Sequence, residues 1–216
     1  MSIEKQISKI NKEIKEQAEL IAVSKTRSIE DINEAYNQGQ KKFGENRVQE
    51  IVDKFNKLPK DIEWHMIGHL QKNKVKYISE FISLIHSLDR LSLANEINKN
   101  GKKHDKSINC LIQIKISKEE SKFGLNIDEL DSFYNEVKML KNINILGLMG
   151  MATFTDDIEL INQEFKEMNK LFKKMKAIDS NFKILSIGMS DDYKLAINNG
   201  SNMIRVGSKI FGKRNY

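Results

Sequence analysis

The most distinctive chemical group near the start of this sequence is a lysine at the end of an apolar run. Residues 20–23 are apolar, Ser24 and Lys25 follow them, and a helical pattern begins at Ile29. An ammonium group that is removed from water has a lowered pKa, and a lysine of lowered pKa is the nucleophile that condenses with an aldehyde. The alternative is that the flexible stem of Lys25 carries its charge to the solvent, as lysines usually do. Lys25 is therefore a candidate Schiff-base residue, with the solvated lysine as the competing interpretation.

Two segments near the C-terminus have the residue types of an anion site. Residues 188–192, Gly-Met-Ser-Asp-Asp, lead from an apolar run into a helical pattern, and Ser190 is the candidate N-cap. Free N–H groups and the helix dipole favour a phosphate there. Residues 205–208 end the last strand, where Gly207 lets a ligand approach the backbone closely. The alternative is that Ser190 and the two aspartates merely cap a helix, because neighbouring carboxylates repel a phosphate.

Other strand ends supply three further candidates: Asn46, His65 and Arg205. By two-residue alternation Arg205 points to the same side of its strand as Gly207. Its guanidinium is always charged and accepts no hydrogen bond, so it would keep a facing ring nitrogen unprotonated; the alternative is an ion pair with a buried carboxylate. His65 and His69 are four residues apart but not on a helix, so we expect packing or hydrogen bonding from His65 rather than zinc binding.

The elements that must position these residues alternate regularly. Strand-like runs lie at 20–25, 42–46, 62–68, 81–88, 107–116, 143–153, 183–190 and 203–207, with helical patterns between them. Strict alternation of strand and helix predicts parallel strands, and eight such units favour a single (β/α)₈ barrel over an open sheet. Barrels of this kind bind ligands at the carboxyl ends of their strands, where the candidate residues fall.

Both ends of the barrel pattern are unusual. Ile3, Ile7, Ile10 and Ile14 form one apolar stripe, which predicts an extra helix before the first strand. After the eighth strand only residues 210–216 remain, too few for a normal final helix. We expect the N-terminal helix to cover that gap, and residues 1–216 to form one domain.

Composition excludes several classes of function. The chain has 36 Lys and Arg against 30 Asp and Glu, a net charge of +6, but its lysines are interleaved with glutamates, so we expect no nucleic acid partner. No apolar run approaches the roughly 20 residues of a membrane span, and the charged N-terminus has no signal-peptide pattern. A single cysteine, Cys110, rules out an internal disulfide. We therefore expect a cytoplasmic protein that does not bind a membrane. We also expect a monomer.

Nearly the whole chain carries recognisable motifs, at residues 22–26, 43–50, 64–74, 86–90, 119–124, 147–152, 185–193, 205–207 and 210–214. They include Ala-Val-Ser-Lys-Thr, Phe-Gly-Glu-Asn-Arg-Val-Gln-Glu and Trp-His-Met-Ile-Gly-His. Each motif alone is weak, but together they resemble the pyridoxal phosphate homeostasis proteins.

The resemblance implies a barrel like the N-terminal domain of alanine racemase, holding pyridoxal 5′-phosphate as a Schiff base on Lys25. It implies phosphate contacts around Ser190 and Gly207, and Arg205 near the ring nitrogen. It also implies cofactor carrying or buffering and an effect on amino-acid balance, without established turnover, with pyridoxal-phosphate-dependent apo-enzymes as candidate recipients. The expected cofactor-binding set is Lys25, Asn46, His65, Ser190, Arg205 and Gly207, and no catalytic or metal-binding residue is expected.

The sequence departs from the family at four positions: Ser28 and Thr153 stand where proline is frequent, Lys115 where asparagine is, and Asn202 where a hydroxyl residue is. The first two affect loop stiffness, and the last two affect detailed ligand contacts.

The competing function is a pyridoxal-phosphate-dependent racemase or lyase. Alanine racemase takes a catalytic tyrosine from a second domain, which we expect to be missing because the chain ends just past the eighth strand. A nucleic-acid or partner-binding module driven by the positive charge has the least support.

Overall fold

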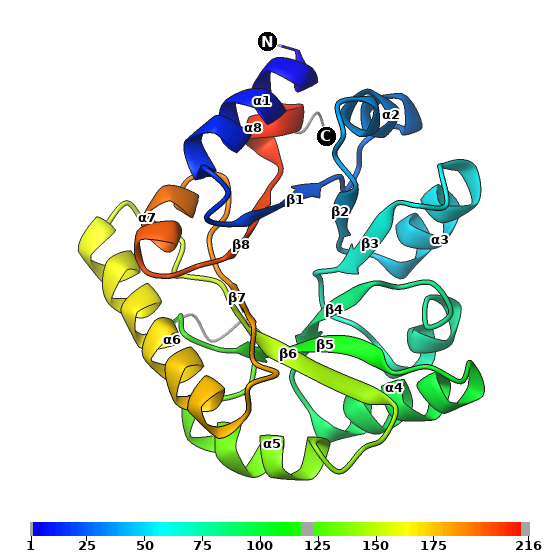
Figure 1. The fold of residues 1–216 in the computed structure, drawn as a ribbon, viewed down its shortest axis with the longest axis vertical. Helices are drawn as coiled ribbons and strands as arrows, with labels where there is room; N and C mark the ends of the chain where they lie inside the picture. The colour runs from blue at the N-terminus through cyan, green and yellow to red at the C-terminus, as the bar shows by residue number, and fades with distance from the viewer. Residues whose placement is uncertain (1, 118–122, 213–216) are drawn as a thin grey trace.

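Eight parallel strands close into a barrel in sequence order (Figure 1). The computed structural model describes residues 2–117 and 123–212. Strand β8 pairs with β1, with Ile21 opposite Arg205, and this pairing closes the ring. The strands are β1 (Glu19–Val23), β2 (Lys42–Glu45), β3 (Glu63–Met66), β4 (Leu84–Leu88), β5 (Ile108–Ile114), β6 (Ile143–Gly150), β7 (Ile184–Ser186) and β8 (Met203–Val206). The predicted (β/α)₈ barrel is thereby confirmed.

Helices surround the barrel and connect successive strands (Figure 1). They are α1 (Ile3–Ile14), α2 (Ile29–Asn37), α3 (Val48–Lys57), the 3₁₀ helix η1 (Lys72–Tyr77), α4 (Leu91–Lys103), the 3₁₀ helix η2 (Ile127–Glu129), α5 (Leu130–Val137), α6 (Ile158–Ile178), α7 (Tyr193–Asn198) and α8 (Ser208–Phe211). None of the helices in the described ranges is long and apolar enough to cross a membrane.

Residue types explain where α2 begins and ends. The Ser28 hydroxyl accepts the N–H of Asp31 at the start of α2, and Gly39, with φ at +86°, follows its end as expected. The strand predicted over 183–190 is shorter, because Gly188 at φ +95° turns the chain after β7. Between β3 and β4, where the sequence analysis expects a helical pattern, the chain forms the 3₁₀ helix η1.

Apolar side chains form two layers. The larger layer lies between strands and helices, and a smaller cluster fills the barrel interior with Ile21, Leu84, Leu111, Met149 and Met203. Such filling makes the barrel a packed core rather than a pore. The strand ends are therefore left as the place for a ligand.

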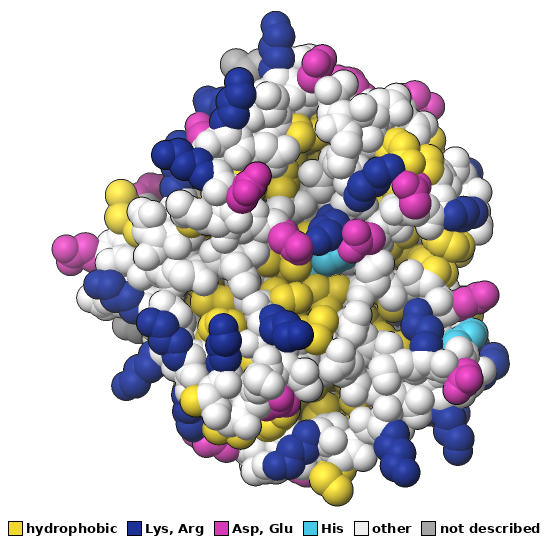
Figure 2. Space-filling model, viewed as in Figure 1, with side chains coloured by type: hydrophobic (Ala, Val, Ile, Leu, Met, Phe, Trp, Pro, Cys, Tyr) yellow, Lys and Arg dark blue, Asp and Glu magenta, His cyan; other side chains and the backbone are white. Residues whose placement is uncertain are grey.

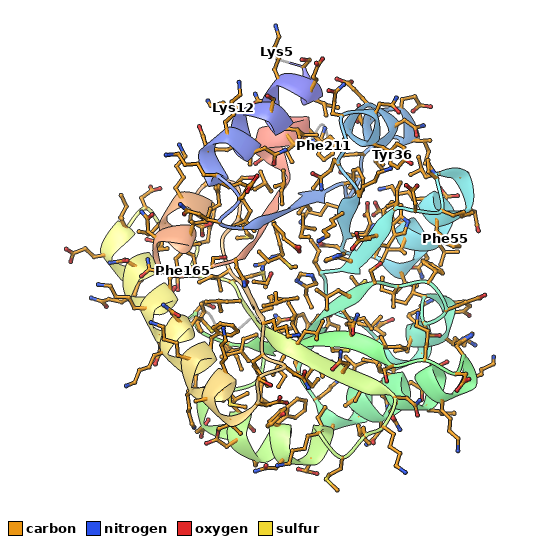
Figure 3. All side chains as sticks on the ribbon, viewed as in Figure 1. Lys5, Lys12, Tyr36, Phe55, Phe165 and Phe211 are labelled. Atoms are coloured by element: carbon orange, nitrogen blue, oxygen red, sulfur yellow. The ribbon has the colours of Figure 1, made fainter. Side chains whose placement is uncertain are left out.

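Helix α1 occupies the expected position beside the short last helix. It packs against α2 and α8, and its apolar stripe Ile7, Ile10 and Ile14 is buried (Figure 1). Figure 3 shows Lys5 and Lys12 pointing from the same helix into solvent. The predicted N-terminal helix thus covers the region that the four-residue α8 leaves open.

Charged side chains of both signs mix over the surface. On the face shown in Figure 2, lysines and arginines are spaced around the rim with acidic side chains among them.

The motif residues 119–122 and 213–214 lie outside the described residues, and the extent of the domain over 1–216 stays a prediction.

Candidate functional site

A pocket of about 460 Å³ lies at the carboxyl ends of the strands. It is lined by Val23, Lys25, Arg27, Asn46, Ile67, Gly68, His69, Gln113, Phe123, Met151, Met189, Ser190, Asp191, Arg205, Gly207, Ser208 and Gly212. Five of the six predicted site residues therefore meet around one cavity, and His65 is not among them. A larger hollow of about 780 Å³ lies between α1 and the amino ends of β1 and β2, the end where barrels of this kind do not place ligands.

Lys25 lies two residues beyond the end of β1 and is half-buried. Val23 lines the pocket as well, as two-residue alternation along the chain requires. Among the lining residues that the structure describes, Lys25 is the one lysine. The side of the pocket formed by β1 therefore presents a single primary amine.

Asn46 stands at the corresponding position after β2. A Cβ atom added to Gly68 would lie 2.5 Å from the carbonyl oxygen of Asn46, so the loops after β2 and β3 touch backbone to backbone. Glycine at 68 permits this approach, and it places both loops at the pocket wall.

Ser190 does not cap a helix, which corrects the sequence prediction. Helix α7 begins at Tyr193, and the residue before it is Asp192, whose carboxylate accepts the Met189 N–H at 2.5 Å. The N–H groups of Asp192 and Tyr193, which an N-cap at Ser190 would accept, donate to the Met189 carbonyl at 3.3 Å and 2.9 Å. The Ser190 hydroxyl instead accepts the Gly207 N–H at 3.2 Å, so it joins the loops after β7 and β8.

Gly207 is closely packed against the first strand. An added Cβ would lie 3.2 Å from the carbonyl oxygen of Val23 and 3.3 Å from its Cβ. Since Val23 and Gly207 both line the pocket, a side chain at 207 would push the two strand ends apart.

Arg205 places a buried positive charge at the pocket. Its guanidinium donates to the Ser186 carbonyl at 2.7 Å, to the Ser186 hydroxyl at 2.6 Å and to the Gly150 carbonyl at 2.9 Å. Burial lowers its pKa to about 10, with Asp192 opposing the shift, so it stays charged at neutral pH. No ion pair between described residues includes it, which leaves the predicted ion-pair alternative without a partner there.

His65 lies inside the barrel, on β3, rather than at a strand end. Its Nδ1 is 2.9 Å from His86 Nε2, and His86 Nδ1 is 3.2 Å from the Ser186 hydroxyl that Arg205 contacts. The strand continues past His65 because the Ile67 N–H still bonds the Glu45 carbonyl. Burial, with a smaller effect of Lys42, lowers the pKa of His65 to about 3, and burial places the pKa of His86 well below its usual range. Both imidazoles are therefore neutral near pH 7.

Sequence reasoning missed the opposite wall of the pocket. The His69 ring stacks on Phe123 with centroids 4.0 Å apart, and Gln113 donates to the Phe123 carbonyl at 2.8 Å. His69 Nδ1 lies 3.8 Å from Asp89 Oδ2. Two features of the sequence pointed to this wall. Gln113 is a polar residue in an otherwise apolar strand, and two-residue alternation places Ile67 and His69 on the same face of the chain as His65.

Arg27 brings the C-terminal segment to the pocket. Its guanidinium donates to the Gly212 carbonyl and lies 5.8 Å from the centre of the Phe211 ring. Within residues 2–117 and 123–212, no three histidine, cysteine or acidic side chains are grouped to hold a metal ion. The groups that line the pocket are an amine, two guanidiniums, an imidazole, a carboxylate, side-chain amides, hydroxyls and the backbone.

The sequence matches the family described as alanine racemase, N-terminal domain, over residues 1–215. It is 41% identical over 202 residues to a pyridoxal phosphate homeostasis protein of Pasteurella multocida, covering 91% of this chain and 87% of that protein. The protein of the same name from Escherichia coli is 38% identical over 205 residues, covering 93% and 88%.

Solved structures give the same fold. PipY of Synechococcus elongatus, with PLP bound, matches with a TM-score of 0.88 at 30% identity over 98% of this chain and 100% of that one. Alanine racemase of Streptomyces lavendulae matches with a TM-score of 0.78 over 99% of this chain and 57% of its own, and at 10% identity this likeness shows the fold alone.

Proposed function

Because this chain belongs to the family of pyridoxal phosphate homeostasis proteins, we propose that it binds pyridoxal 5′-phosphate at the carboxyl ends of the barrel strands and serves in the homeostasis of that cofactor. The observation that carries the proposal is the meeting of Lys25, Arg205 and Gly207 in one pocket. An amine, a buried guanidinium and an open backbone position are separated by up to 182 residues in sequence, and the fold brings them together.

The donor set fits the cofactor's three functional groups. The pocket volume of about 460 Å³ falls within the range of roughly 300–1,000 Å³ usual for small-molecule sites. The phosphate would be held by Ser190, Gly207 and Ser208, which lie together in the pocket. Arg205 would face the ring nitrogen. Asp191 also lines the pocket, but its side chain is exposed, so water screens its charge.

Lys25 is the residue that we propose bonds the cofactor. When bound, pyridoxal phosphate supplies an aldehyde carbon, to which the lysine amine bonds with loss of water. The role of Arg205 is electrostatic: a donor that stays charged leaves the facing nitrogen unprotonated and weakens the ring as an electron sink. This supports a protein that holds its cofactor without turnover.

A substitution at Gly207 tests the proposed phosphate site. We expect Gly207→Val to weaken binding of pyridoxal phosphate more than binding of unphosphorylated pyridoxal, because the new side chain disturbs the loop after β8, which we propose holds the phosphate. Its pressure on Val23 at the end of β1 affects both compounds alike. Loss of one such hydrogen bond costs about 1–3 kcal/mol, or roughly five- to 150-fold in Kd. Spectroscopic titration with both compounds measures the difference.

The matched control is Gly39→Ala, where an added Cβ meets no atom within 4 Å and the residue lines the hollow at the amino ends of the strands instead of the pocket. It should bind both compounds as the wild-type protein does. Equal weakening of both compounds by Gly207→Val would contradict the assignment of the phosphate to this loop.

The alternative function is an amino-acid racemase, and one observation favours it. Racemisation needs a base on each face of the α-carbon, and His69 lines the same pocket as Lys25. Burial, with a contribution from Arg90, lowers the pKa of His69, which favours its basic form. Its ring is nevertheless stacked on Phe123, and its Nδ1 lies 3.8 Å from Asp89 Oδ2, so these two contacts set its orientation.

We therefore expect the chirality of added L-alanine or D-alanine to stay unchanged after long incubation with excess loaded protein. Chiral chromatography measures it. Interconversion of L-alanine and D-alanine at a rate proportional to the protein concentration would establish the racemase instead, if both Lys25→Ala and His69→Gln abolish it.

Pyridoxal-phosphate-dependent apo-enzymes are the proposed recipients, since the pocket lies at one end of the barrel and includes exposed positions such as Phe123 and Met189. We also propose that the protein is a cytoplasmic monomer. Its one cysteine, Cys110, is buried and unpaired, which fits a reducing compartment.

A further inference from the structure

The backbone on both sides of Lys25 is held by side chains of the next β/α unit. The Ser24 hydroxyl donates to Glu45 Oε1 at 2.6 Å, and the Ser24 carbonyl accepts from Lys54 Nζ at 2.8 Å. The Thr26 N–H donates to Glu50 Oε2 at 2.8 Å. The flanking residues are thus fixed from the helix side of the sheet, and Lys25 itself lines the pocket.

Lys54 is the centre of this network. Besides the Ser24 carbonyl, its ammonium lies 2.7 Å from Glu45 Oε1 and 3.2 Å from Glu50 Oε2. These three acceptors match the three donors of an ammonium group. Lys54 is 5% exposed and Glu45 is fully buried, although lysine and glutamate are almost never buried unless paired.

Burial makes this arrangement a costly way to join a strand to a helix. Burial raises the pKa of Glu45 to about 7, although Lys54 and Ser24 act to lower it. Well-packed apolar residues of similar volume often stabilise a fold as well as a buried ion pair does. Packing alone therefore gives no reason for three ionisable groups behind the β1 end.

The turn after Lys25 is strained. Thr26 has φ at +64°, in the left-handed region that residues other than glycine rarely adopt. Such a conformation persists only where its surroundings hold it. Here Glu50 holds the Thr26 N–H, and the Thr26 hydroxyl donates to the Lys25 carbonyl at 2.6 Å.

We propose that Lys54 is a positioning residue for Lys25: by binding the Ser24 carbonyl, Glu45 and Glu50 together, it fixes the turn that directs the Lys25 amine into the pocket. The inference rests on the proposed role of Lys25 in binding the cofactor. Lys54 itself does not line the pocket. Its loss should therefore slow bond formation at Lys25 and leave the non-covalent contacts to the cofactor in place.

The test compares two ligands on each variant. Stopped-flow absorbance with pyridoxal phosphate gives the rate of bond formation, and titration with an analogue that has a methyl group in place of the aldehyde gives non-covalent affinity. In Lys54→Met we expect the rate to fall by about tenfold to a hundredfold, because small misplacements of a reacting group have effects of that size. The analogue's Kd should change by less than about twofold.

The control is Lys57→Met, the same substitution three residues along α3. Lys57 is exposed and pairs only with Asp53 at 2.8 Å among the described contacts, so both measurements should match the wild type. Glu50→Ala is a second variant that keeps the Lys54–Glu45 pair and releases the Thr26 N–H. It should show the same selective slowing, and Glu50→Gln, which keeps an acceptor oxygen, should restore much of the rate.

Unchanged rates in folded Lys54→Met and Glu50→Ala would overturn the positioning role, as would an equal loss of analogue affinity. If Lys54→Met does not fold, Glu50→Ala alone decides. A wild-type protein that forms no bond with the cofactor would overturn the proposed function itself, and the positioning role with it. The two failures are therefore distinguishable.

Discussion

Replacing Lys25 with alanine is expected to abolish the covalent adduct that borohydride traps after the protein is loaded with pyridoxal phosphate. Lys25 is the one lysine among the described residues that line the pocket. Reduction makes the bond between amine and aldehyde permanent, so the modified peptide can be identified by mass spectrometry. The wild-type protein should carry the modification on the peptide containing Lys25, with near-complete loss in the variant.

A surface lysine provides the control. Lys174→Ala removes an exposed lysine on α6 that pairs with Asp131, and its trapped adduct should equal that of the wild type. An adduct of undiminished amount in Lys25→Ala would show that another amine carries the cofactor. The assignment of this lysine would then be wrong, whatever the affinity of the pocket.

Gly147→Ala is expected to cause a large loss of stability, because an added Cβ there would meet another atom more closely than at any other glycine in the described residues. An added Cβ at this position would lie 1.8 Å from the carbonyl oxygen of Ile184 on the neighbouring strand β7. Relief of that clash must move backbone, because the obstacle is not a flexible side chain. We expect the free energy of unfolding to fall by at least about 3 kcal/mol, from combined overpacking and backbone strain.

Thermal unfolding followed by circular dichroism measures the effect, with roughly 2–4 °C of Tm per kcal/mol for a chain of this size. Gly39→Ala is the matched control, since Gly39 has φ at +86° but open space around its Cα. That control isolates the cost of a left-handed alanine, about 1–2 kcal/mol. A Gly147→Ala protein as stable as Gly39→Ala would mean that β6 and β7 are not packed as described.

Much of this site could be predicted because a barrel brings strand ends together. Lys25, Asn46, Arg205 and Gly207 each follow or end a strand, so their convergence needed only the strand count and two-residue alternation. His65 was misplaced because it lies within the predicted run 62–68 and not at its end: hydrogen bonding in β3 continues beyond it to Ile67, and His65 bonds His86 inside the barrel.

The features of the site that the sequence did not predict depend on contacts between residues distant in sequence. Ser190 resembles an N-cap, but its hydroxyl accepts the N–H of Gly207, 17 residues away, and α7 begins at Tyr193. The stacking of His69 on Phe123 joins residues 54 apart in sequence, across β3 and the segment after β5. No periodicity within either segment carries that information, so side-chain pairing between loops was not predictable.

The buried row of hydrogen bonds from Arg205 to His65 has one end whose direction is fixed. A guanidinium can only donate, so the Ser186 hydroxyl accepts from Arg205. That hydroxyl has a second lone pair as well as a proton, so it can either donate to His86 Nδ1 or accept from it, and the tautomer of His86 sets the direction of the bond to His65. With either tautomer Arg205 has no acceptor atom for a proton that arrives along the row. The row therefore ends, on the side of the pocket, at a group that takes up no proton.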